Sequence, residues 1–187
     1  MNQYIIRYFH GVIWVVVNKT KLDDEIMKQV KKYKSLLFIC SSNNIQLLYD
    51  VMDILPVELE YLYLEVNEEM TFKEKDPVNI SFDTLPMNLK HLQINIPNFN
   101  QSLDNLPLLL KTLIITSIYF DKALNNLPLG LERLEINSYF VNPLENIPLT
   151  LKFLNIPYRY PHAYLKEIKK KIPQIIFNNA DNRFNNL

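Results

Sequence analysis

The 187-residue chain has few glycines, a single cysteine and no excess of charge of either sign. Its two glycines, Gly11 and Gly130, stand far apart, which argues against a glycine-rich phosphate-binding loop. One cysteine, Cys40, excludes an internal disulfide framework and a multi-cysteine zinc site. Twenty basic residues balance twenty acidic ones, so net charge does not indicate nucleic-acid or membrane binding. We therefore expect no cofactor, no nucleic-acid partner and no membrane partner.

Long hydrophobic runs are also missing. The apolar run over residues 12–17 is much shorter than the roughly 20 residues that cross a bilayer. No small-residue cleavage site follows it, so we do not expect a secretory signal peptide. Its β-branched residues favour a buried strand instead. We expect an intracellular protein, located in the host cytoplasm if the gene is viral.

A repeat fills the middle of the chain. A Leu-Pro or Ile-Pro pair recurs five times, with prolines 30, 21, 21 and 20 residues apart. Apolar residues stand three, six and eight positions after every proline, which defines the unit [LI]-P-x-x-L-x-x-L-x-[LI]. The leucines six positions after the prolines are Leu62, Leu92, Leu113, Leu134 and Leu154. Agreement of five copies at every position indicates a repeat architecture.

The pattern within one unit predicts its local structure. The last two apolar positions alternate, which is typical of a short strand with one buried face. Proline suits the turn before the strand, because it fixes φ and lacks an amide donor. Units of about 21 residues cannot bury an apolar face alone, so they must stack. Phe99, Phe120 and Phe140, each eight residues before a proline, are predicted to form an aromatic row on the convex side.

The repeat predicts an α/β solenoid. We expect a right-handed coil with a curved parallel sheet of about seven strands on its concave face. Mostly irregular turns would form the convex face, and helices are expected near both ends. The first unit carries extra residues within 66–77, which we expect to form a bulging loop.

The unit resembles a leucine-rich repeat of the FNIP-repeat type, which is abundant in social amoebae and in giant viruses of protists. The resemblance rests on residues 99–107 followed by Leu110, Leu113 and Ile115, and it continues around Phe120 and Phe140. It covers residues 55–157 and implies the leucine-rich-repeat fold without implying a particular activity. Members of the family often carry an F-box, and residues 1–54 show none that is convincing.

The two ends are expected to cap the repeats within one continuous structural domain. Residues 1–54 are interpreted as an N-terminal cap with degenerate strand-helix units. There we predict strands within residues 4–17 and at 36–40, and helices near 21–33, with a capping box from Thr20 to Asp23, and near 43–53. Residues 158–187 are predicted to supply a helix over 161–171, a last strand at 174–177 and a tail.

Groups able to perform catalysis are scattered along the chain. His10, His91 and His162 show no metal-ligand spacing, and Cys40 lies in an apolar segment that favours a packed thiol. We therefore expect no enzyme, and we assign no catalytic, cofactor-binding or metal-binding residue.

The residues that alternate with the buried strand positions must point away from the core. Several of them are large and apolar, which favours a binding surface on the concave face, although an ordinary exposed strand face gives the same pattern. The predicted contact residues are Tyr61, Tyr63, His91, Gln93, Ile114, Arg133, Glu135 and Phe153. The hypothesis is a non-catalytic protein–protein interaction module with an unknown protein partner. The alternatives are a substrate-recognition adaptor for a ubiquitin ligase, which only the family resemblance suggests, and a self-associating structural protein.

Overall fold

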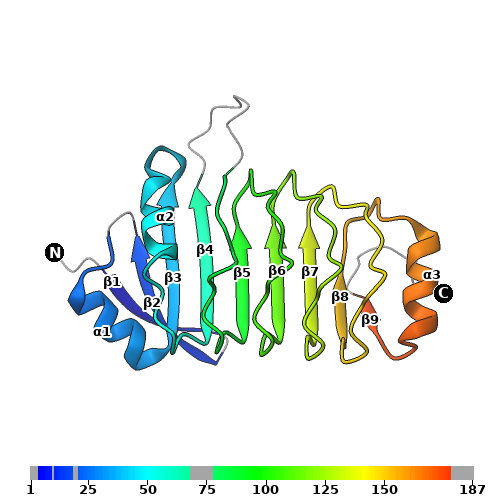
Figure 1. Ribbon diagram of the computed structural model, residues 1–187, viewed down its shortest axis with the longest axis horizontal. Helices are drawn as coiled ribbons and strands as arrows, with labels where there is room; N and C mark the ends of the chain where they lie inside the picture. Colours follow the sequence, from blue (N-terminus) through cyan, green and yellow to red (C-terminus); the bar gives the residue numbers. More distant parts are fainter. Residues whose placement is uncertain (1–3, 10, 19–20, 68–77, 178–187) are drawn as a thin grey trace.

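A computed structural model describes residues 4–9, 11–18, 21–67 and 78–177 of the protein. Within these residues, nine strands form a single sheet in which every strand pairs with its neighbours in sequence (Figure 1). The strands are β1 (Tyr4–Phe9), β2 (Val12–Asn18), β3 (Ser35–Ser41), β4 (Tyr61–Asn67), β5 (His91–Asn95), β6 (Thr112–Thr116), β7 (Arg133–Asn137), β8 (Phe153–Asn155) and β9 (Ile176–Phe177). The helices are α1 (Asp24–Tyr33), α2 (Gln46–Met52), α3 (His162–Lys171) and a 3-10 turn, η1 (Ser42–Asn44).

Each proline of the repeat is buried in a turn that leads into one of the strands β4 to β8. The proline carbonyl accepts a hydrogen bond from the amide three residues later, as from Leu110 to Pro107 at 3.0 Å. The following strand pairs in register with its neighbour, so Leu113 lies between Leu92 and Leu134. All five leucines six positions after the prolines are fully buried, which confirms that they form successive rungs of the core.

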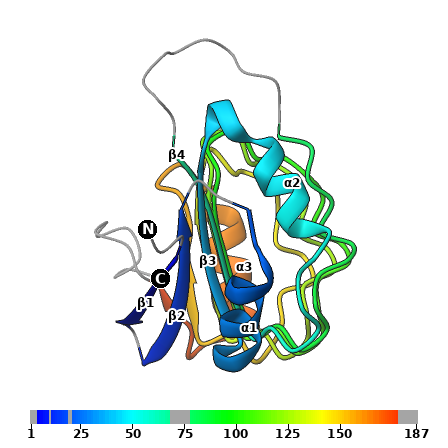
Figure 2. The ribbon, with the colours of Figure 1, turned by 90° about the vertical axis from the view of Figure 1, so that its left-hand side faces the viewer.

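The segments that return from one strand to the next all lie on the same face of the sheet and enclose the core (Figure 2). Within them, Phe99, Phe120 and Phe140 are fully buried and nearly parallel, with neighbouring ring centroids 5.7 and 6.1 Å apart. The predicted aromatic row is therefore confirmed. Phe82 extends it at one end, at 5.2 Å from Phe99, and Tyr160 extends it at the other, at 5.9 Å from Phe140.

The mostly parallel sheet with few helices is compatible with the open, solenoid-like α/β fold that the repeat predicts. The sheet has nine strands, where the sequence predicts about seven. It is also not wholly parallel, because β1 runs antiparallel to β2. Gly11, with φ of 78°, lies in the tight turn between them, where a left-handed backbone favours glycine.

The N-terminal helix begins later than the predicted capping box. Asp23, not Thr20, is its N-cap, and the Asp23 carboxylate accepts a hydrogen bond from the Ile26 amide at 2.9 Å. A carboxylate at this position satisfies a free amide and faces the positive end of the helix. Ile26 and Val30 of α1 pack into the core. Thr20, most of the loop expected within 66–77, and the tail at 178–187 lie outside the described residues.

Replacing Leu113 by alanine is expected to lower the free energy of unfolding by about 2–5 kcal/mol, because it leaves a cavity in the middle of the core. Leu108→Ala is the matched control, since Leu108 is 84% exposed and its truncation should change stability by less than about 0.5 kcal/mol. Urea titrations of both variants test this. Equal losses would show that position 113 is not core.

Deleting residues 1–20 removes β1 and β2 and leaves the edge of β3, with which β2 pairs, uncovered. Val15 and Val17, which are fully buried, would leave the core at the same time. An uncovered parallel edge next to exposed apolar core promotes association, so the truncated chain should aggregate. Size-exclusion chromatography beside the full chain is the measurement. A monomeric truncation that unfolds cooperatively would contradict the capping role.

Candidate interaction surface

One face of the sheet is packed against the core, while helices and return segments leave the other face uncovered in the view of Figure 2. We call this second face the open face. Period-two alternation along β4 to β8 places all eight predicted contact residues on it. None of them is fully buried; Arg133 is exposed and the other seven are half-buried. The structure thus brings them together on one surface, and their role in binding stays a prediction.

The N-terminal end of the open face is partly occupied by Trp14 of β2. This side chain is only 4% exposed, because its ring packs edge-on against Tyr61 and His91 at centroid distances of 6.1 and 6.2 Å. Tyr61 and His91 also contact each other at 6.2 Å. These two predicted contact residues therefore belong to an aromatic cluster within the protein and offer a partner less surface than expected.

The position of Trp14 was not recognised in the sequence, although a signal for it exists. Val15 and Val17 point into the core. Trp14 and Val16 alternate with them along β2, so these two side chains must point to the open face. The apolar run over 12–17 hides this alternation, because its residues are apolar on both faces of the strand.

Tyr63 occupies the middle of the open face on β4. Its side chain is half-buried and lies near Glu65 on the same strand and Asn95 on the neighbouring strand. Burial raises the pKa of Tyr63 to about 12, and the nearby Glu65 carboxylate adds to the shift. Tyr63 therefore presents a neutral hydroxyl on the open face.

Arg133, Glu135 and Phe153 form a second fixed group toward the C-terminal end of the open face. The Arg133 guanidinium lies 3.9 Å above the Phe153 ring centroid and forms an ion pair of 2.6 Å with Glu135. The second oxygen of Glu135 accepts a hydrogen bond from Asn155 at 3.3 Å. Cation–π stacking and the ion pair hold three side chains from two strands in one arrangement. Sequence reasoning did not select Asn155, which stands in the same alternating register.

The described residues offer little to chemistry. No three of their histidine, cysteine, aspartate or glutamate side chains gather as a metal site would require. Cys40 is fully buried, and burial raises the pKa of its thiol to about 11, which suppresses the nucleophilic thiolate. Among the described helices, none has the length and apolar character needed to cross a membrane.

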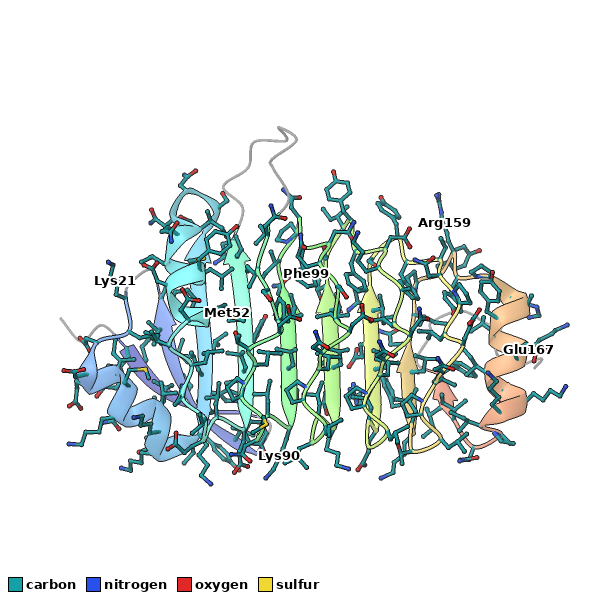
Figure 3. All side chains as sticks on the ribbon, in the orientation of Figure 1. Lys21, Met52, Lys90, Phe99, Arg159 and Glu167 are labelled. Atoms are coloured by element: carbon teal, nitrogen blue, oxygen red, sulfur yellow. The ribbon has the colours of Figure 1, made fainter. Side chains whose placement is uncertain are left out.

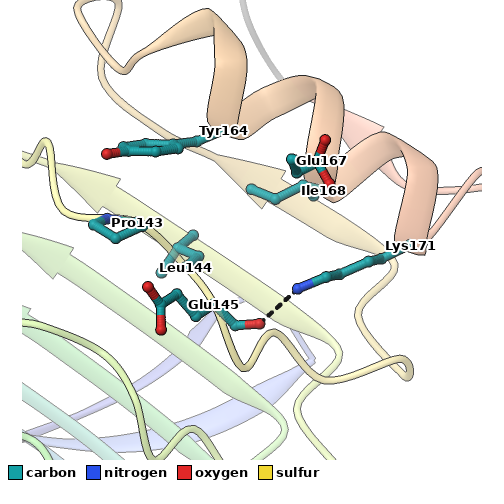
Figure 4. Close-up of a pocket in the computed structure, with 7 residues that line it drawn as sticks. All are labelled: Pro143, Leu144, Glu145, Tyr164, Glu167, Ile168 and Lys171. Carbon is teal, nitrogen blue, oxygen red and sulfur yellow. Dashed lines mark hydrogen bonds between the residues drawn. The ribbon is translucent and has the colours of Figure 1, made fainter.

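A small cleft lies between α3 and the return segment that precedes β8 (Figure 4). Its lining residues are Pro143, Leu144, Glu145, Tyr164, Glu167, Ile168 and Lys171. The Lys171 ammonium closes one side by donating a hydrogen bond to the Glu145 carbonyl at 2.7 Å. Its volume of about 240 Å³ is below the usual size of a ligand pocket. The cleft is best described as packing between the helix and the last repeat unit.

Comparison of the chain with protein-family models, with curated proteins and with solved structures finds no match. The function is therefore inferred from the geometry of the open face and from the repeat itself.

The raised pKa of Tyr63 has a measurable consequence for stability at high pH. Because the folded-state pKa is about 12 and the ordinary value is 10.0, the folded protein holds this proton more tightly than the unfolded chain. The resulting stabilisation is fully present below about pH 10 and is lost as the pH rises toward about 12. Relative to Tyr63→Phe, the wild-type chain should lose stability over this interval in urea titrations. A constant difference between the two proteins would show that the phenol is solvated.

Proposed function

We propose that the protein is a non-catalytic protein–protein interaction module, built as a short right-handed leucine-rich-repeat solenoid of the FNIP type, and that its open face binds a protein partner. The observation that carries the proposal is the set of partly exposed polar and aromatic side chains on β4 to β8, part of which is held in place by an ion pair and a cation–π contact. Tyr63 and the Arg133–Glu135–Phe153 group are the main members of this set.

Preorganisation supports this proposal. Binding usually costs free energy because side chains at an interface lose rotamer freedom. On the open face, part of that cost is already met, since Arg133 is held by Phe153 and Glu135 before any partner arrives. Arginine and aromatic residues also contribute most of the energy at typical interfaces.

The contact is expected to centre on the middle and C-terminal end of the open face. Trp14 packs on Tyr61 and His91, so a partner gains less from these two residues. Tyr63, Gln93 and Ile114 stay half-exposed on β4, β5 and β6, and Arg133 and Glu135 of β7 link them to the half-exposed Phe153 of β8, which gives a continuous surface. Self-association would use the same surface, with a second copy as the partner.

The proposal is tested by site-directed photo-crosslinking in extract of the cells that express the gene. A photoreactive phenylalanine analogue replaces Ile114 on the open face. In the matched control it replaces Tyr119, which follows the end of β6 and is 57% exposed. We expect a discrete cross-linked protein, either another protein or a second copy, from position 114 and not from position 119. Excess wild-type chain should compete for this cross-link.

The competition also uses a variant of the open face. Tyr63→Ala combined with Phe153→Ala should compete at least about tenfold less well, as for the loss of two interface anchors. Its thermal melt should stay close to that of the wild type, because neither side chain lies in the core. Equal competition by the variant, or equal cross-linking from both positions, would exclude the open face as the contact surface.

A further inference from the structure

The turns that lead into β4 to β8 expose an apolar side chain in every repeat unit. The residue directly after each proline is large and apolar in all five copies, and its exposed fraction is between 70% and 84%. We call these residues the apolar turn row: Val57, Met87, Leu108, Leu129 and Leu149. Side chains of this kind are seldom left in water five times in succession, and they are not needed by the core or by the open face.

Strand pairing arranges the row along one edge of the molecule. Because β4 to β8 are parallel and in register, the five turns lie at the same ends of the strands, about 4.8 Å apart from rung to rung. In Figure 1 these turns follow the lower edge of the sheet, which we call the strand-start edge. The turn between β1 and β2 lies at the same edge, and Tyr8 and Ile13, paired beside it, are 75% and 40% exposed.

Lysines accompany the apolar turn row. In the turns, Glu60 forms ion pairs with Lys34 and Lys90, and Glu132 forms ion pairs with Lys111 and Lys152. Figure 3 shows Lys90 at this edge. Each glutamate is therefore shared by two lysines, so each group of three keeps a positive charge.

The helices add more positive charge. Both α1 and α3 end where β3 and β9 begin, and their last turns carry Lys31, Lys32 and Lys169 to Lys171. The turns and helix ends thus hold nine lysines against three glutamates, with Glu58 as the third. Four further acids stand three residues before the prolines on the return segments, namely Asp53, Asp83, Asp104 and Glu145. Even with these included, the edge is positive in a chain that is neutral overall.

We propose that the strand-start edge docks on an anionic membrane surface, with the apolar turn row entering the interface and the lysines contacting lipid headgroups. Apolar side chains flanked by lysines are the combination that binds such surfaces. A row one side chain wide supplies little of the roughly 800 Å² per partner that stable protein interfaces bury. A lipid interface, in contrast, accepts protruding side chains without a complementary shape. A second copy is disfavoured because two positive edges repel each other.

This inference departs from the expectation of no membrane partner. That expectation came from the net charge of the whole chain, and a neutral total conceals a local excess of lysine at one edge.

The test is co-sedimentation of the full chain with vesicles of phosphatidylcholine alone or mixed with phosphatidylserine. We expect binding to the phosphatidylserine vesicles that weakens as salt is added, and much weaker binding to phosphatidylcholine alone. The triple variant Leu108→Ser, Leu129→Ser and Leu149→Ser should bind these vesicles at least about tenfold more weakly, because three apolar side chains are no longer buried in the membrane interface. Absence of binding by the wild-type chain overturns the proposal.

The control variant changes three exposed apolar residues at the opposite ends of the strands: Ile118→Ser, Tyr119→Ser and Tyr139→Ser. It should bind vesicles as the wild type does, and so should Tyr63→Ala with Phe153→Ala, which separates this surface from the open face. If the turn-row variant does not melt cooperatively, Leu129→Ser alone should still weaken binding by about threefold. Equal vesicle binding by the turn-row variant and the control variant overturns the proposal. If the turn-row variant then sediments differently from the wild type in the absence of vesicles, the row is assigned to contacts between copies of the protein.

Discussion

In-register pairing of parallel strands is the constraint on which the other features of the structure depend. From β4 to β8, each residue of a unit lies beside the equivalent residue of the next unit. Any property of one position is therefore repeated in space as a line. Buried leucines become the core, the phenylalanines of the return segments become a stacked row, and lysines and glutamates before the strands become alternating ion pairs. A slip of one residue would exchange core and open face together.

The repeat made much of this arrangement predictable. Spacing of 20 or 21 residues between prolines identifies equivalent positions, and period-two alternation then separates inward from outward residues. Leu113 and Phe120 were placed correctly because both the local pattern and the stacking of units require the same burial. The open-face residues were located for the same reason, since each one stands next to a buried position of its strand.

Features outside the repeat were harder to predict. The antiparallel β1 and the contact of Trp14 with Tyr61 depend on how a hairpin meets the sheet, and no periodic signal encodes that contact. The apolar turn row is also periodic, but the alternation of strand residues does not predict it, because its members stand in the turns before the strands. These residues are seen to form a row only from the register of the strands, which places Leu108 and Leu129 on the same edge of the sheet.

The aromatic row has a consequence for how such a chain can change length. Phe99, Phe120, Phe140 and Tyr160 follow one another at 5.7, 6.1 and 5.9 Å, so every junction between units is nearly the same. A duplicated unit inserted between two of them would meet the neighbours that it already fits, and a deleted one would leave ends that match. Length can therefore drift by whole units during gene duplication without redesign of the core, while the hairpin and α3, which fit only the ends, stay fixed. Selection can then adjust the reach of the open face independently of the stability of its scaffold.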